Sequence, residues 1–291
     1  MRIIRGIFRN GNHQLRAGWN ILLVVATILA LTVGGRIVAL LRTDSGYLFN
    51  QDGWATVFYG LGPYILITVW FAVKIVHKRP LASIGLTRPD VKRLCTGFIT
   101  GACLLTAVIV IMLVCSLAEL QGDWLSPQWG RVDWVSLFIA SFMAGVSEEI
   151  LFRGYIQQLL SSRLSPLWAV FIIAAAFSLE HMANGNFTWI SALNIGLVSL
   201  LFSGVTMRTG NLYFAIALHA AWNMFQGYVF SVPVSGIPTE GIYAMQLSGA
   251  DWLSGGAFGL EGSIITTLVL GLACVAMLGV PIRGKKISVS S

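Results

Sequence analysis

Long apolar runs divide the chain, and short polar or charged segments separate them. About 20 apolar residues in a helix cross the roughly 30 Å of hydrocarbon in a bilayer, so about eight of these runs predict transmembrane helices. The fold class expected is therefore all-α, a polytopic transmembrane helical bundle. The predicted helices cover residues 19–41, 54–76, 95–118, 134–160, 166–181, 189–207, 212–230 and 263–282.

The chain shows no internal repeat, no inverted pair of broken helices and no low-complexity tract, which predicts one integral membrane domain over residues 1–291. The one long connection, 231–262, is rich in Gly, Ser and Pro but also holds aromatic residues. The pattern leaves two placements open for this segment: on the outer interface of the membrane, or folded over the protein.

Composition agrees with a lipid bilayer as the surroundings. Hydrophobic residues make up 56% and charged residues 11% of the chain, against about a quarter charged in soluble domains. The mean hydropathy is +0.77. The net charge is +7, but the Lys and Arg residues do not form a basic stripe with interleaved aromatics, so no nucleic-acid partner is expected. The four cysteines form no CxxC pair and have no companion His at zinc-site spacing.

Charged residues between the runs predict how the protein is oriented, because basic loops favour the cytoplasmic side. The residues assigned to the basic side are Arg2, Arg5, Arg9, Arg16, Lys78, Arg79, Arg88, Lys92, Arg93, Arg163, Arg208, Arg283, Lys285 and Lys286. The acidic residues assigned to the other side are Asp44, Asp52, Glu119, Asp123, Asp133, Glu180, Glu240, Asp251 and Glu261, with Arg42 and Arg131 as exceptions. This alternation predicts a multi-pass protein of the cell membrane with both termini in the cytoplasm. The first apolar run lacks a small-residue cleavage site, so it is expected to be retained.

Most ionisable side chains inside the spans fall into three clusters, and each is costly to insert into lipid. The first cluster is SEEILFRGY, in which Glu149 and Arg153 share a helical face at i,i+4. Glu148 points about 100° away from that face. One carboxylate is therefore expected to pair with the arginine, which leaves the other free for chemistry.

The second cluster is FSLEH, with His181 near the end of the fifth span, and the third is HAAWN, where His219 and Asn223 share a face. The fourth and fifth spans form a hairpin near Arg163, and the depths of Glu148 and His181 differ by only about 5 Å. That pair is expected to touch, and the three clusters are expected to meet in a polar cavity within the membrane.

Such a site has the groups needed to hydrolyse a peptide bond. Glu148 with His181 is expected to hold and deprotonate a water molecule, while His219 and Asn223 donate hydrogen bonds to the oxyanion. The same four side chains also suit a divalent metal such as zinc. No HExxH motif is present, and the metal-free mechanism is favoured.

The segments EEILFR, FSLEH and HAAWN resemble the EExxxR, FxxxH and HxxxN pattern of the CPBP (Abi) family of intramembrane proteases. This family includes the CAAX prenyl endopeptidases (CAAX prenyl protease 2) and bacteriocin-processing or immunity homologues. The resemblance covers about 79–230, places the protease-like core in spans 4 to 7, and implies a peptidase of glutamic or metalloprotease type. The substrate expected for such a peptidase is a membrane-associated protein or peptide in the bilayer. The residues that match its motifs, and so its catalytic groups, are Glu148, Glu149, Arg153, His181, His219 and Asn223.

Two other interpretations use the same buried charges. A transporter-like protein would use them for ion passage, but it predicts inverted repeats that the chain does not show. A catalytically inactive membrane protein would keep Glu149–Arg153 as a structural ion pair and His219 with Asn223 as bonds between helices. Loss of function on replacing Glu148 distinguishes the enzyme from the inactive protein.

Overall fold

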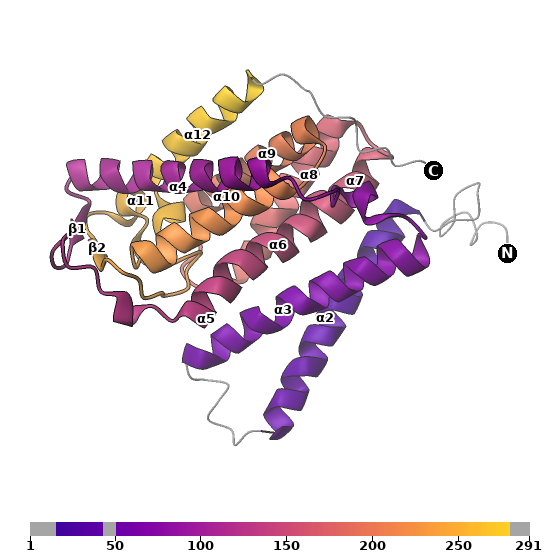
Figure 1. The fold of residues 1–291 in the computed structure, drawn as a ribbon, viewed down its shortest axis with the longest axis horizontal. Helices are drawn as coiled ribbons and strands as arrows, with labels where there is room; N and C mark the ends of the chain where they lie inside the picture. Colours follow the sequence, from indigo (N-terminus) through magenta and orange to yellow (C-terminus); the bar gives the residue numbers. More distant parts are fainter. Residues whose placement is uncertain (1–15, 43–50, 280–291) are drawn as a thin grey trace.

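The computed structural model describes residues 16–42 and 51–279 and confirms the prediction of an all-α fold (Figure 1). The helices are α2 (Ala17–Arg42), α3 (Gln51–Phe71), α4 (Val91–Val114), α5 (Trp134–Leu137), α6 (Ala144–Glu149), α7 (Gln157–Ser161), α8 (Pro166–Glu180), α9 (Trp189–Thr209), α10 (Tyr213–Asn223), α11 (Asp251–Ser254) and α12 (Ile264–Leu278). Each of the eight predicted spans coincides with one helix or one run of joined helical segments.

Several spans contain a π-helical segment, in which the backbone hydrogen bonds reach one residue further than in an α-helix. Segments η4 (Phe138–Met143) and η5 (Ile150–Ile156) join α5, α6 and α7 into one helical run over 134–161. In the same way, η1 (Ala72–Val76) extends α3 and η7 (Met224–Val229) extends α10. Because π segments often mark functional sites, it is notable that η5 starts directly after Glu149.

This is a membrane protein by the length and composition of its helices. Among the described residues, the stretches long and apolar enough to cross a bilayer are Ala17–Gly35, Val91–Val114, Pro166–Ala183 and Trp189–Thr209. Shorter apolar helices cover Leu61–Val76 and Ile264–Leu278. Large apolar side chains such as Val114, Trp168 and Leu272 are exposed on the outside of the bundle, as lipid-facing side chains would be.

Local sequence signals explain where the helices around the cavity begin. The hydroxyl of Ser165 accepts from the backbone N–H of Trp168, and Pro166 occupies the first turn of α8. Thr188 and Ser191 form a capping box at the start of α9. Ser263 caps α12 by accepting from the N–H of Ile265. These caps fix where three helices around the cavity, α8, α9 and α12, begin.

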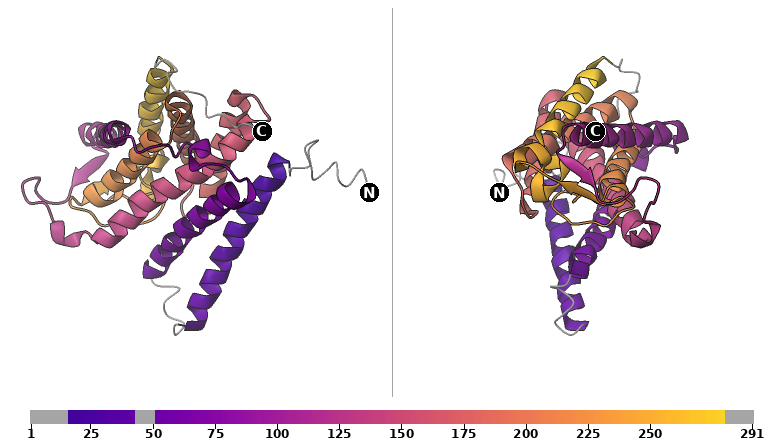
Figure 2. Two further views of the ribbon diagram at one scale, coloured as in Figure 1. Left: turned by 45° about the vertical axis from the view of Figure 1, so that its right-hand side comes forward. Right: turned by 90° about the vertical axis from the view of Figure 1, so that its left-hand side faces the viewer.

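Helix α10 is the centre of the bundle, and every residue from Ala215 to Asn223 is buried. It packs along α4, where a Cβ atom on Gly97 or Gly101 would collide with the backbone carbonyls of Phe214 or Leu218. Figures 1 and 2 show α10 between α4 and α6, while α2 and α3 lie together on one flank. The glycines therefore bring the helix that carries His219 against α4.

The segment 231–262 folds over one end of the bundle, which decides between the two placements left open by the sequence. Its strand β2 (Met245–Leu247) pairs antiparallel with β1 (Ala118–Leu120), with Ala118 opposite Leu247. The segments η8 (Gly256–Phe258) and η9 (Leu260–Gly262) then lead into α12. Leu260, Phe258 and Val232 are buried in the core, so this long connection is part of the packed structure.

The basic loops around Arg163 and Arg208 lie at the opposite end of the bundle from β1 and β2 (Figure 1). The orientation of these ends in the membrane stays a prediction. The predicted cytoplasmic termini, with Arg2, Arg5, Arg9, Arg283, Lys285 and Lys286, lie outside the described residues, as does Asp44.

Candidate active site

Glu149 and Arg153 form the buried ion pair that their spacing predicts. The two side chains have no exposed surface, and Arg153 Nη1 donates to Glu149 Oε1 at 2.9 Å. The same oxygen lies 3.1 Å from Nδ1 of His219. Glu149 therefore joins the helical run 134–161 to α10, with a cation on one side and an imidazole on the other.

Further groups, whose contact with Arg153 the sequence does not predict, hold its guanidinium in place. Its Nη2 donates to the hydroxyl of Ser199 on α9 at 2.7 Å. Its central carbon lies 4.3 Å from the ring centroid of Phe177 and 5.0 Å from that of Phe202. An aromatic face attracts a cation, and the attraction is larger where water is excluded. Only the packing of α8 and α9 reveals these partners.

The imidazole of His219 is held in one orientation. It stacks on Phe202 with ring centroids 5.1 Å apart and an interplanar angle of 21°. With Nδ1 directed at Glu149, its Nε2 lies 3.9 Å from Oε2 of Glu148. That oxygen of Glu148 is buried and has no hydrogen-bond partner in the part of the chain that the structure describes. Glu148 is therefore the carboxylate that takes no part in the Arg153 ion pair, as its helical position predicts.

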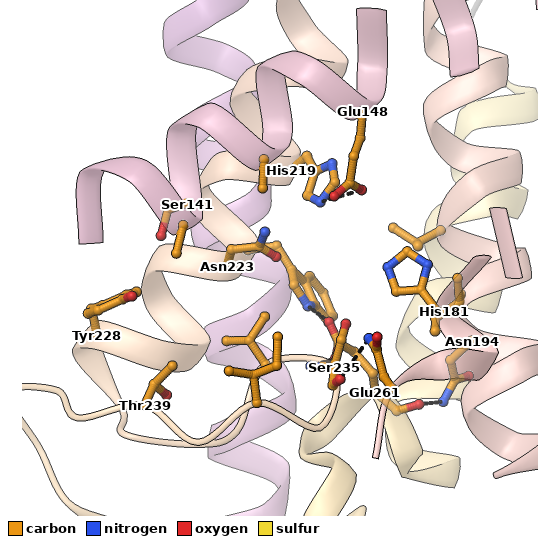
Figure 3. Close-up of a pocket in the computed structure, with 18 of the residues that line it drawn as sticks. Ser141, Glu148, His181, Asn194, His219, Asn223, Tyr228, Ser235, Thr239 and Glu261 are labelled. Carbon is orange, nitrogen blue, oxygen red and sulfur yellow. Dashed lines mark hydrogen bonds and ion pairs between the residues drawn. The ribbon is translucent and has the colours of Figure 1, made fainter. Parts of the chain in front are cut away.

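One cavity of about 360 Å³ brings together residues from three predicted clusters (Figure 3). Glu148, His181, His219 and Asn223 all line it. Figure 3 shows Glu148 and the His219–Asn223 face of α10 on one side and His181 on another wall. The expected meeting of the fourth, fifth and seventh spans is thus present, with Glu149 and Arg153 buried behind the cavity.

His181 is placed differently from the expectation that it touches Glu148. Helix α8 ends at Glu180, and His181 begins the short 3-10 segment η6 (His181–Ala183). Its Nδ1 lies 2.8 Å from the carbonyl oxygen of Phe177 and 2.9 Å from Oε2 of Glu180. These two acceptors hold the ring on its own wall, and the imidazole within 4 Å of Glu148 is that of His219.

Two acids that the charge pattern assigned to the non-cytoplasmic side also lie at this site. Glu180 contacts His181, because it is the last residue of α8. Glu261 lines the cavity and accepts hydrogen bonds from the Ser235 N–H at 2.6 Å, the Ser235 hydroxyl at 3.0 Å and Trp222 Nε1 at 3.3 Å. Burial raises the pKa of Glu261, and the hydrogen bonds from Ser235 oppose this rise. No local pattern distinguishes Glu261 from a loop acid, since its burial depends on how 231–262 folds.

The arrangement does not form a ready metal site. Zinc sites in proteins use three or four ligand side chains that converge within about 2 Å of the ion. Among the residues that the structure describes, no three His, Cys, Asp or Glu side chains are grouped closely enough to hold a metal ion. Of the donors suggested by the sequence, Glu148, His219 and Asn223 lie on one side of the cavity and His181 lies on another wall, so the four do not converge on one point.

Comparison with known proteins adds a family to this geometry. Residues 130–225 match the family described as Rce1-like, type II CAAX prenyl endopeptidase Rce1-like. An uncharacterized protein, YyaK of Bacillus subtilis (strain 168), is 30% identical over 171 residues, which cover 54% of this chain and 54% of that protein. The match thus spans about half the length of this curated relative. The resemblance drawn from the motifs is confirmed, and the segment 231–262 lies outside the matched family region.

Proposed function

We propose that this protein, whose residues 130–225 belong to the Rce1-like family of type II CAAX endopeptidases, is an intramembrane endopeptidase. Its substrate would be a membrane-associated protein or peptide, of which it hydrolyses one peptide bond. The observation that carries the proposal is the single cavity lined by Glu148, His181, His219 and Asn223, with one carboxylate oxygen unpartnered. A purely structural cluster would bond this oxygen at hydrogen-bond distance, because an unsatisfied buried acceptor is costly, whereas Nε2 of His219 lies 3.9 Å from it.

In the proposed reaction Glu148 is the general base. It takes a proton from water as the water oxygen attacks the carbonyl carbon of the peptide bond. The proton then passes to the amide nitrogen as the C–N bond breaks, which yields a new carboxyl group and a new amine. His181 faces the same cavity and, with Nδ1 held by Glu180 and Phe177, presents its other ring nitrogen to the water or the leaving group.

His219 and Asn223 would stabilise the oxyanion that forms on the attacked carbonyl. Nδ1 of His219 donates to Glu149, so Nε2 donates as well only when the imidazole is protonated. Nδ1 of His219 lies 3.1 Å from Glu149 and Nε2 lies 3.9 Å from Glu148, so a protonated imidazole would have a carboxylate beside each ring nitrogen. A fixed cation beside the reacting carbonyl lowers the energy of the negatively charged intermediate.

The test compares cleavage of candidate peptides by purified protein in liposomes, using wild type, Glu148→Gln and His219→Ala. Each variant is expected to lose at least about a hundredfold in kcat/KM, as is usual when a general base or an oxyanion donor is removed. Glu119→Gln, at an exposed acid on β1, is the matched control and is expected to cleave normally. Equal cleavage by wild type, Glu148→Gln and His219→Ala would end the proposal.

The same assay, repeated after treatment with a chelator, tests the metal-free mechanism. Cleavage is expected to persist after incubation with a chelator and dialysis, because the catalytic groups supply both the base and the oxyanion donors. Loss of activity on chelation and its return with zinc would assign the metal-dependent alternative.

A further inference from the structure

Two buried polar faces run side by side behind the cavity. One belongs to the helical run 134–161 and consists of Glu149, Arg153 and Gln157, spaced four residues apart, and the other belongs to α9. The residues of the α9 face are Ser199, Ser203 and Thr206. All six side chains are at most 1% exposed. Polar faces of this kind are expensive in the interior of a membrane protein, so they require partners.

The two faces meet at the active site and lead to the same end of the bundle. They meet where Arg153 donates to Ser199 at 2.7 Å. Further along, a Cβ atom on Gly154 would lie 2.9 Å from the carbonyl oxygen of Ile84 and 3.2 Å from Leu212, which follows the end of α9. Gln157 follows Arg153 by four residues and Ser203 follows Ser199 by four residues, and both helices run toward the end of the bundle with the basic loops.

Many polar atoms of these faces have no hydrogen-bond partner within the described chain. They are Glu149 Oε2, Arg153 Nε, Gln157 Oε1 and Nε2, Ser203 Oγ and Thr206 Oγ1. Gln157 is the clearest case, because both atoms of a wholly buried amide lack a partner. Buried polar groups in proteins are bonded to protein or to ordered water, and a buried water molecule typically makes about three such bonds.

The same pattern continues to the surface. Ser83 Oγ and Arg79 Nη2 are also buried atoms without partners, and they lie at the end of the bundle where Ile84 contacts Gly154. Arg79 is partly exposed. The other end of the series is the unpartnered Oε2 of Glu148 at the cavity. Unsatisfied polar atoms thus occur beside the reacting carboxylate, along both buried faces and at the end of the bundle with the basic loops.

We propose that Gln157, Ser203 and Thr206 bind a file of water molecules that connects Arg153 to the bundle end near Ser83. The assignment of these waters to hydrolysis rests on the proposed function. A substrate that occupies the 360 Å³ cavity excludes bulk water from that side, whereas the file reaches Glu148 and Glu149 from behind. Water for the reaction is supplied along this route while the substrate is bound.

Water binding is measured first, independently of activity, by water-edited solid-state NMR of the protein in lipid vesicles. Magnetisation from water is expected to reach the side-chain amide of Gln157 as fast as that of Asn223, which lines the cavity. The combined change Ser203→Ala with Thr206→Val is expected to slow this transfer severalfold. The control Thr100→Val leaves it unchanged, because that hydroxyl donates to the Thr96 carbonyl on an exposed face of α4. Transfer to Gln157 as slow as to the core residue Ile173 would overturn the proposal.

Kinetics then test what the water does. Gln157→Leu is expected to lower kcat on the order of tenfold with KM unchanged, since the substrate still binds but its water arrives slowly. An unchanged kcat in a folded and active Gln157→Leu protein would overturn the role in supply. If wild type shows rapid transfer to Gln157 but cleaves no peptide, the proposed function fails while the water site stands.

Discussion

The charged residues of this protein act as one connected cluster. Arg153 is wholly buried and is held by Glu149, Ser199 and two aromatic rings, and Glu149 in turn contacts His219. Removal of one member leaves the opposite charge buried and unpaired. An unpaired buried charge lowers the stability of the protein more than the replacement of both members by apolar groups does.

Glu149→Ala is therefore expected to destabilise the protein by about 3–5 kcal/mol, because Arg153 loses its counter-charge. The measurement is the free energy of unfolding in detergent, by denaturant titration. Glu148→Gln serves as the comparison and is expected to change stability far less, since Oε2 of Glu148 has no hydrogen-bond partner to lose. Equal destabilisation by the two substitutions would contradict the division of roles between the adjacent acids.

Glu261 ties the two halves of the segment 231–262 together at the cavity wall. Glu261→Ala removes three hydrogen bonds, two from Ser235 and one from Trp222. The expected loss of stability is about 1–3 kcal/mol, because Ser235 N–H is left without its acceptor. The measurement is thermal unfolding followed by tryptophan fluorescence, which also reports on Trp222. Glu240→Ala, at an exposed rim acid, is the control, and the same shift in both variants would show that Glu261 has no such role.

Sequence patterns identified most, but not all, of the residues of the cavity and its charged cluster. The i,i+4 spacing identified the Glu149–Arg153 pair, and the motif order identified His181, His219 and Asn223. The contacts of Ser199, Glu180 and Glu261 were not predicted, because a serine or an acid in a helix or a loop has no local mark of its partner. Their roles depend on which helix they pack against.

At the level of the elements, helix positions follow directly from apolar run length, whereas helix contacts follow from small residues. Gly97 and Gly101 let α4 approach the backbone of α10 closely. Gly196 on α9 has no atom within 4 Å of the position its Cβ would take. Substitution by alanine is therefore expected to have opposite effects on stability at these two kinds of glycine.

Gly101→Ala is expected to destabilise the protein by about 1–3 kcal/mol, because the new methyl group collides with the Leu218 carbonyl and the Cβ atom of Ala221. It is also expected to lower peptidase activity, since displacement of α10 moves His219. Gly196→Ala, the matched control, is expected to stabilise by up to about 1 kcal/mol through helix propensity alone. Unfolding free energies in detergent measure both, and stabilisation by Gly101→Ala would refute the close contact.

On the scale of the whole molecule, the two ends of the bundle differ in charge. Arg163 and Arg208 lie beside the loops of one end, while Glu119 on β1 and the loop acids Asp123 and Glu240 lie at the other. Positive loops favour the cytoplasm, so the first end is predicted to face inward.

Single cysteines introduced at two exposed loop positions test this orientation in a variant whose native cysteines are replaced by serine. Ser126→Cys is expected to react with a membrane-impermeant maleimide from outside sealed cells, and Ser162→Cys only after the membrane is opened. Labelling of both positions from the same side would contradict the predicted topology.

The sequence by itself determined the helices, the membrane as their surroundings and the family that residues 130–225 match. Run length, charge between runs and i,i+4 spacing are local properties, and a helix satisfies its backbone within its own segment. The tertiary structure decided which histidine lies beside Glu148, the burial of Glu261 and the approach of the two polar faces behind the cavity. Those features depend on contacts between segments far apart in the chain, where the depth and rotation of each helix are set by its neighbours.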